Sequence, residues 1–88
     1  MLNIIYAPIF LRELQKMEAD LRVEAVEKIY LFKDKVNHRA LKVHKLHGSP
    51  SGRYSFSVNY KYRIIFRYLS KNEVALLDIG DHDIYANI

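Results

Sequence analysis

The sequence has 88 residues, 50% of them hydrophobic, and a formal net charge of +4 at pH 7, which fits one folded domain over residues 1–88 and excludes a disordered tail. Cysteine is absent, which excludes a disulfide framework and a cysteine-based zinc site. No apolar run approaches the roughly 20 residues that cross a bilayer, and no secretory signal is evident, so we expect a cytoplasmic protein without a membrane partner.

The first part of the chain is predicted to form one strand and two helices. Residues 2–6 are apolar and β-branched, which favours a strand, and Pro8 suits the first turn of a helix. Helical spacing then recurs at Phe10, Leu11, Leu14 and Met17. Asp20 is the predicted N-cap of a second helix that ends near residues 37–38. That helix is expected to bury one stripe, made of Leu21, Ala25, Ile29, Phe32 and Val36.

After residue 40 the hydrophobic period changes from 3.6 to 2, which predicts strands. The expected strands are 41–46, 54–58, 62–69 and 74–79, joined by polar turns, and Gly80 is expected to start a polar tail. Consecutive strands with short turns are antiparallel. We therefore predict an α+β fold, with one N-terminal strand and two helices packed on one face of a four- to five-stranded, largely antiparallel twisted sheet.

Positive charge is concentrated in one window of the sequence. Residues 35–72 contain nine Lys or Arg and no Asp or Glu. The nine are Lys35, Arg39, Lys42, Lys45, Arg53, Lys61, Arg63, Arg67 and Lys71. Such segregation favours a nucleic-acid surface, because these cations displace counterions from phosphate. A solvated basic face, or a surface for an acidic protein, is the alternative.

Alternation along the predicted strands sorts their side chains onto two faces. Tyr62, Ile64, Phe66 and Tyr68 share the apolar face that must meet the helices. Ser57, Asn59, Arg63 and Arg67 are expected on the uncovered face. Arg63 and Arg67 would lie roughly 13 Å apart at the rise of a strand, a spacing that suits two consecutive RNA phosphates. Alternatively, Arg63 pairs with Asp78 or Glu73 on the neighbouring strand.

Histidines are the second chemical signal. His82 follows the last predicted strand, where an imidazole can serve as a general acid or base, or have no task at all. Asp81 and Asp83 flank it and would favour its protonated form. His38, His44 and His47 lie in or near the basic window, but their spacing matches no firm metal motif. We predict neither a metal site nor a cofactor.

These residue types suit metal-independent RNA cleavage, in which the 2′-hydroxyl attacks the adjacent phosphorus. Arg63 would stabilise the phosphorane, His82 would protonate the leaving oxygen, and His47 or His44 would take the first proton. Tyr85 would either stack on a base or pack the tail. The predicted RNA-binding cations are Lys42, Lys45, Arg53, Lys61 and Arg67.

Three segments carry a resemblance to a known family. They are Leu46-His47-Gly48, the run 52–66 that includes Tyr54-Ser55-Phe56 and Tyr62-Arg63-Ile64, and the closing Gly80-Asp81-His82-Asp83-Ile84-Tyr85. In order and spacing they resemble the RelE/ParE toxin superfamily of type II toxin–antitoxin systems, closest to its RelE/HigB-like branch. With the strand and two helices before them, the likeness covers nearly the whole chain. It implies a RelE-like fold.

The resemblance also implies a function. Such toxins are made with a small antitoxin that silences them, and RelE-like members cut mRNA in the ribosomal A site. By position, the family's strand arginine, C-terminal histidine and C-terminal aromatic fall on Arg63, His82 and Tyr85. RelE itself has two lysines on the preceding strand where this chain has Ser55 and Ser57. This departure favours a histidine-driven mechanism, with Lys42, Lys45 and Arg53 supplying the missing charge.

Two other functions stay open at this point. One is a ParE-like poison of DNA gyrase that cuts no RNA, although ParE-like members generally lack the tail histidine. The other is an inactive module of the same fold that only binds a partner. The first predicts DNA damage, and the second predicts no effect on growth.

Overall fold

The computed structural model describes residues 1–48 and 52–81. Its elements in chain order are β1 (Asn3–Tyr6), α1 (Pro8–Lys16), α2 (Ala19–Phe32), the 3₁₀ turn η1 (Lys35–Asn37), β2 (His44–Lys45), β3 (Tyr54–Ser57), β4 (Tyr62–Ser70) and β5 (Glu73–Asp81). In this part of the chain, neither helix is long and apolar enough to cross a membrane.

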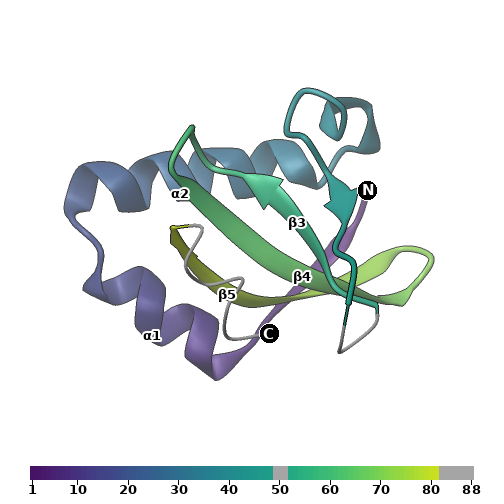
Figure 1. Ribbon diagram of the computed structural model, residues 1–88, viewed down its shortest axis with the longest axis horizontal. Coiled ribbons are helices and arrows are strands. Elements are labelled where there is room, and N and C mark those ends of the chain that lie inside the picture. The colour runs from purple at the N-terminus through teal and green to yellow at the C-terminus, as the bar shows by residue number, and fades with distance from the viewer. Residues whose placement is uncertain (49–51, 82–88) are drawn as a thin grey trace.

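The described strands form one five-stranded sheet in the order β1-β5-β4-β3-β2. The first strand runs parallel to β5, with Asn3 opposite Glu73, and every other neighbouring pair is antiparallel. In Figure 1, β3, β4 and β5 lie side by side, and the two helices are joined at the left of the view. The predicted α+β fold, with its N-terminal strand and two helices on a largely antiparallel sheet, is confirmed.

The core lies between the helices and one face of the sheet. Its buried members include Phe10, Ala25, Ile29, Phe32, Phe56, Ile64, Phe66, Leu76 and Ile79. Phe32 of α2 stacks on Phe56 of β3 with ring centroids 4.2 Å apart, and the ring of His38 also stacks on Phe32, at 4.7 Å. Aromatic side chains bury large apolar areas and gain further from such ring contacts. This packing fixes which face of the sheet the helices cover.

Two predictions about α2 are wrong. The helix begins at Ala19 with Glu18 as the N-cap residue, so Asp20 lies in the first turn, where its charge suits the helix dipole. The helix ends at Phe32, and Val36 is 79% exposed rather than part of the buried stripe. Side chains compete with the helix here, because Asp34 accepts from the Val36 N–H and Asn37 donates to the Leu31 carbonyl.

The predicted strand 41–46 is also wrong, because only His44 and Lys45 pair with β3. Lys42 has a left-handed backbone with a φ of 58°, which interrupts extended structure before the pair. Leu41 is instead buried in the core, and its carbonyl accepts from the Ser57 N–H at 2.8 Å. A tertiary contact therefore overrides the local preference for a strand.

The last strand is longer than its sequence predicted. It continues through Gly80 and Asp81, which pair with Arg63 and Tyr62 at the start of β4, so the prediction that Gly80 starts the tail is wrong. Ile65 pairs with Asp78 while Phe66 pairs with Leu76, and the shift between them marks a β-bulge. The long partner strand thus places Gly80 directly beside Arg63.

Candidate functional site

The two faces of β4 carry different chemistry. Ile64 and Phe66 are fully buried in the core cluster that includes the helix residues. Because side chains alternate along a strand, Arg63 and Arg67 lie on the opposite face, as predicted. We call this surface the helix-free face; in register it carries Ser55 and Ser57 of β3, Arg63, Ile65 and Arg67 of β4, and Ala75, Asp78 and Gly80 of β5.

Arg63 is held in place by two acceptors. Its Nη1 donates to Ser57 Oγ at 2.7 Å and to the Asn59 carbonyl oxygen at 2.8 Å. These bonds use both Nη1 hydrogens, while Nε and Nη2 have no acceptor among residues 1–48 and 52–81. That remaining edge is the side-on fork that binds phosphate or carboxylate bidentately.

The neighbouring strand β5 presents no side chain directly opposite Arg63. Its partner there is Gly80, which has none. The alternative role predicted for Arg63 was an ion pair with Asp78 or Glu73, and the structure records neither within the described residues. The arrangement therefore favours an external partner for the free edge of Arg63.

Asn59 does not share the helix-free face, so its predicted position is wrong. It lies beyond the end of β3, in the turn 58–61, where strand alternation no longer applies. Its Nδ2 donates to Glu24 Oε1 of α2 at 2.7 Å, on the helix side of the sheet. Its Oδ1 accepts from the backbone N–H groups of Lys61 and Tyr62. Asn59 contributes to the site through its carbonyl rather than its side chain.

The helix-free face is not bare along its whole length. Ser55 and Ile65 lie on it and are both 0% exposed. Arg63 is half-buried on one side of this closed middle, and Arg67 is exposed on the other. The two arginines are therefore separated by a buried row rather than by an open surface.

The histidines have different environments. His44 of β2 pairs with Ser55 of β3, which in turn pairs with Ile65, so His44 is in register with residues of the helix-free face. Its side chain is exposed, and its Nδ1 is 2.8 Å from the Lys42 carbonyl oxygen. His38 is structural, because it is half-buried against Phe32 and its Nε2 bonds the Phe32 carbonyl at 2.8 Å.

Of the remaining candidates, the structure describes only His47. His47 is exposed and follows the end of β2. His82 and Tyr85 lie outside the described residues, so their predicted roles stay predictions. Within residues 1–48 and 52–81 there is no cluster of three or more His, Asp or Glu that suits a metal ion.

The five cations predicted to bind RNA do not form one cluster. Arg67 shares the face of Arg63, and Arg53 immediately precedes β3. Lys42 and Lys45 are exposed around β2. Lys61 instead lies with its Nζ 5.5 Å from the centre of the Tyr62 ring, and it lines a groove shared with Glu18, Asp20 and Glu24. RNA contacts of all five remain predictions.

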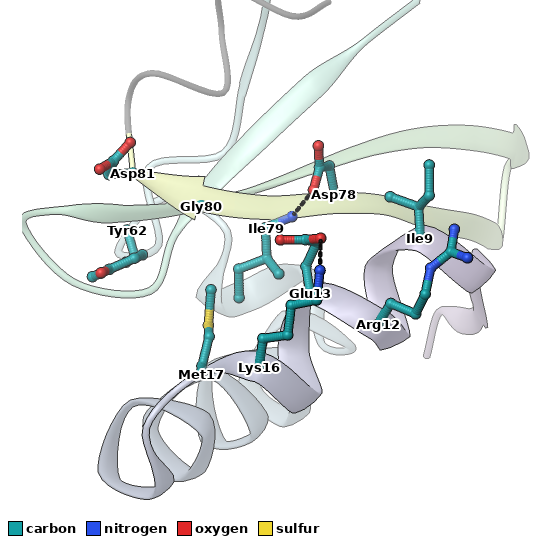
Figure 2. A pocket seen from close by; sticks show the side chains of 10 residues that line it. All are labelled: Ile9, Arg12, Glu13, Lys16, Met17, Tyr62, Asp78, Ile79, Gly80 and Asp81. Carbon is teal, nitrogen blue, oxygen red and sulfur yellow. Dashed lines mark hydrogen bonds and ion pairs between the residues drawn. The ribbon is translucent and has the colours of Figure 1, made fainter.

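A second hollow of about 860 Å³ lies between α1 and β5 (Figure 2). It is lined by Ile9, Arg12, Glu13, Lys16, Met17, Tyr62, Asp78, Ile79, Gly80 and Asp81. Figure 2 shows Met17 and Ile79 pointing toward one another across it, while Asp78 points away from α1. Glu13 and Lys16 of α1 form an ion pair at 3.4 Å beside this hollow. Arg12 also lines it, but within residues 1–48 and 52–81 its guanidinium has no hydrogen bond that fixes it as Ser57 and Asn59 fix Arg63.

Comparison with known proteins supports a class for this fold. No protein-family model and no curated protein matches the sequence. Among solved structures, the chain is similar to the toxin–antitoxin complex RelBE2 from Mycobacterium tuberculosis, with 17% identity over 91% of this chain and 96% of that one and a TM-score of 0.72.

Two further structures agree. The YoeB/ParE toxin from Agrobacterium tumefaciens has 15% identity, covers 92% of this chain and 99% of its own, and gives a TM-score of 0.73. The YoeB–YefM complex from Staphylococcus aureus has 19% identity over 93% and 98% of the two chains, with a TM-score of 0.70. The chain therefore has the fold of the RelE/ParE toxins, as its sequence motifs indicated.

Sequence reasoning missed two residues of the site. Glu24 and Lys28 of α2 both bond the turn 58–61, Glu24 through the Asn59 amide and Lys28 through the Val58 carbonyl at 3.0 Å. Their spacing of four residues places them on one side of the helix. That signal was present in the sequence, but nothing in it indicated which loop this side would meet.

Proposed function

We propose that this chain is the toxin of a type II toxin–antitoxin system and that it cuts mRNA on the ribosome without a metal ion. The observation that carries the proposal is the fixed guanidinium of Arg63, whose Nη1 is bonded to Ser57 and Asn59 while its Nε and Nη2 edge is left for phosphate. A preorganised donor pair of this kind stabilises charge that grows on phosphoryl oxygens in the transition state.

The chemistry assigned to the site is attack of the ribose 2′-hydroxyl on the adjacent phosphorus. Arg63 contacts the non-bridging oxygens and aligns the phosphate. The leaving 5′-oxygen takes a proton from His82, and Tyr85 stacks on a flanking base or packs the tail. The basic window supplies sequence-independent attraction to the RNA backbone.

For the general base, the geometry favours His44 over His47. His44 belongs to the helix-free face, in register with Ser55, whereas His47 follows the end of the strand. A carbonyl oxygen can only accept, so His44 Nδ1 carries the hydrogen that points at the Lys42 oxygen. In the neutral ring, Nε2 then keeps a lone pair and can accept the 2′-hydroxyl proton.

The proposed partners are an antitoxin, mRNA and the ribosome, and the proposed compartment is the cytoplasm. The RelBE2 and YoeB–YefM structures are toxin–antitoxin complexes of the same fold, which supports a cognate antitoxin for this chain. A small acidic or amphipathic protein would complement the basic window.

The test is inducible expression of the chain without its partner, followed by mapping of mRNA ends. We expect new ends within translated regions, and their absence for Arg63→Ala. Intact messages during a growth arrest would contradict cleavage, and DNA damage in the same cells would point to a gyrase poison. Growth without any arrest would indicate an inactive binding module.

A further inference from the structure

Two side chains of helix α2 form hydrogen bonds with the turn that follows β3. Glu24 Oε1 accepts from Asn59 Nδ2 at 2.7 Å, and Lys28 Nζ donates to the Val58 carbonyl at 3.0 Å. Both side chains are half-buried, so these bonds are shielded from water more than surface pairs are. Two consecutive residues of the turn are thus tied to one side of the helix.

Asn59 connects this anchor to the guanidinium. Its side-chain oxygen accepts from the N–H groups of Lys61 and Tyr62 at 2.9 and 2.8 Å, which fixes the turn, and its backbone oxygen accepts from Arg63 Nη1 at 2.8 Å. With the bond from Nδ2 to Glu24, every polar group of the Asn59 side chain is used. The position of the carbonyl that Arg63 contacts therefore depends on Glu24.

We infer that Glu24 is a positioning residue for Arg63, acting through Asn59 and never touching the substrate. A carboxylate accepts more strongly than a neutral oxygen, so the bond to Glu24 holds the amide in one orientation. Without it, the turn can relax, the Asn59 carbonyl moves, and Arg63 keeps only the acceptor on Ser57. The aliphatic part of the Arg63 side chain has several rotatable bonds, so the guanidinium then samples orientations that do not match a phosphate.

The inference rests on the proposed function only for its catalytic consequence. For Glu24→Ala, we expect kcat for RNA cleavage to fall about tenfold with KM changed less than twofold, since orientation is lost but most RNA contacts remain. Glu24→Gln keeps an oxygen that accepts from Asn59 and should retain most of the rate. Lys28→Met removes the second anchor and should lower kcat by a smaller factor. Glu27→Ala, an exposed glutamate on the same helix, is the matched control and should leave kcat unchanged.

Nuclear magnetic resonance of the arginine side chains measures how firmly the Arg63 guanidinium is held, independently of RNA cleavage. In the wild-type chain, the two hydrogen bonds should slow rotation about the Cζ–Nη1 bond of Arg63 and give separate Nη1 hydrogen signals. The two signals should merge into one in Glu24→Ala and stay separate in Glu24→Gln and Glu27→Ala. Thermal unfolding of each variant confirms that it is folded.

The outcomes separate the two proposals. Separate Nη1 signals that survive in folded Glu24→Ala would overturn the positioning role, and so would an equal loss of rate in Glu24→Ala and Glu27→Ala. A wild-type chain that cuts no RNA would contradict the proposed function, while merged Nη1 signals in Glu24→Ala would still support the positioning of Arg63.

Discussion

Ser57 and Arg63 face each other across β3 and β4, and the hydroxyl of Ser57 accepts from Arg63 Nη1 at 2.7 Å. RelE itself, which this chain resembles in sequence, has lysine on the corresponding strand. In this chain the strand supplies an acceptor that orients the neighbouring arginine instead of a second positive charge. Ser57 thus contributes to the site by orienting the guanidinium of Arg63.

Ser57→Ala tests this relationship. The variant removes one of the two acceptors of Nη1 and should lower kcat about tenfold. This is the low end of the about 1.5–3 kcal/mol that hydrogen bonds to charged groups contribute, because the Asn59 acceptor remains. Initial rates on ribosome-bound mRNA give the value. Ser70→Ala, an exposed serine at the end of β4, is the control. A Ser57→Ala rate equal to wild type would show that Asn59 alone orients Arg63.

Arg63 itself should be among the most sensitive of the described residues. Arg63→Ala removes the phosphate fork and should reduce kcat about 10²- to 10³-fold, as the loss of a transition-state donor does in other enzymes. Arg63→Lys should recover little of this, because an ammonium cannot bond Ser57 and Asn59 and still present two parallel donors. The measurement is single-turnover cleavage, with Arg12→Ala on α1 as the control. Full activity of Arg63→Lys would contradict bidentate binding.

The two candidate bases can be separated by substitution. With His44 as base, His44→Gln should lower kcat about 10²- to 10⁴-fold, because the amide has no nitrogen that can accept the 2′-hydroxyl proton. His47→Gln should keep nearly the full rate. The reverse pattern would assign the first proton transfer to His47. The comparison is made on kcat so that binding to the ribosome does not enter.

Tyr68 provides a test of the core at alkaline pH. Burial raises its pKa above the ordinary value of 10.0, and the neighbouring Tyr54 raises it further. Because the pKa is raised in the folded state, the stability linked to Tyr68 is present below pH 10 and is lost as pH rises through its ionisation. The free energy of unfolding in urea should therefore fall less between pH 9 and pH 11 for Tyr68→Phe than for wild type. Tyr30→Phe, at an exposed position, should behave like wild type.

Phe32 should dominate the stability of the domain. Its ring is fully buried and lies against Phe56, Phe66 and His38. Phe32→Ala should cost about 3–5 kcal/mol, which is a large part of the roughly 5–15 kcal/mol available to a small domain. Urea denaturation measures the loss, with Tyr30→Ala as the exposed control. A loss below about 1 kcal/mol would mean that the aromatic stack collapses around the cavity.

The sequence predicted the parts of the site that lie on regular strands. Alternation from Tyr62 onward assigns Arg63 and Phe66 to opposite faces whatever the fold around them, and the structure agrees. The same rule failed for Asn59, because the strand ends at Ser57 and a turn re-aims the next side chains. Alternation also cannot indicate burial on the helix-free face, where Ser55 is fully buried.

Boundaries were least predictable where side chains bond the backbone. Val36 continues the helical spacing from Phe32, yet Asp34 and Asn37 end that pattern with their own hydrogen bonds. The anchor from Glu24 to Asn59 joins residues 35 positions apart, and only the packing of α2 against the sheet brings them together. Long-range contacts of this kind have no local sequence signature.

The parallel pairing of β1 with β5 has a consequence for synthesis. Asn3 pairs with Glu73, and β5 lies between β1 and β4 in the sheet. Chains emerge from the ribosome N-terminus first. Both edges of β1 therefore stay unpaired until about seventy further residues have been made. Pairing of strands so far apart in the sequence is slow and comes late in folding. Arg63 also pairs with Gly80 only after the far end of β5 has been made. A ribosome making this chain has therefore translated nearly all of the described residues before a competent phosphate site exists.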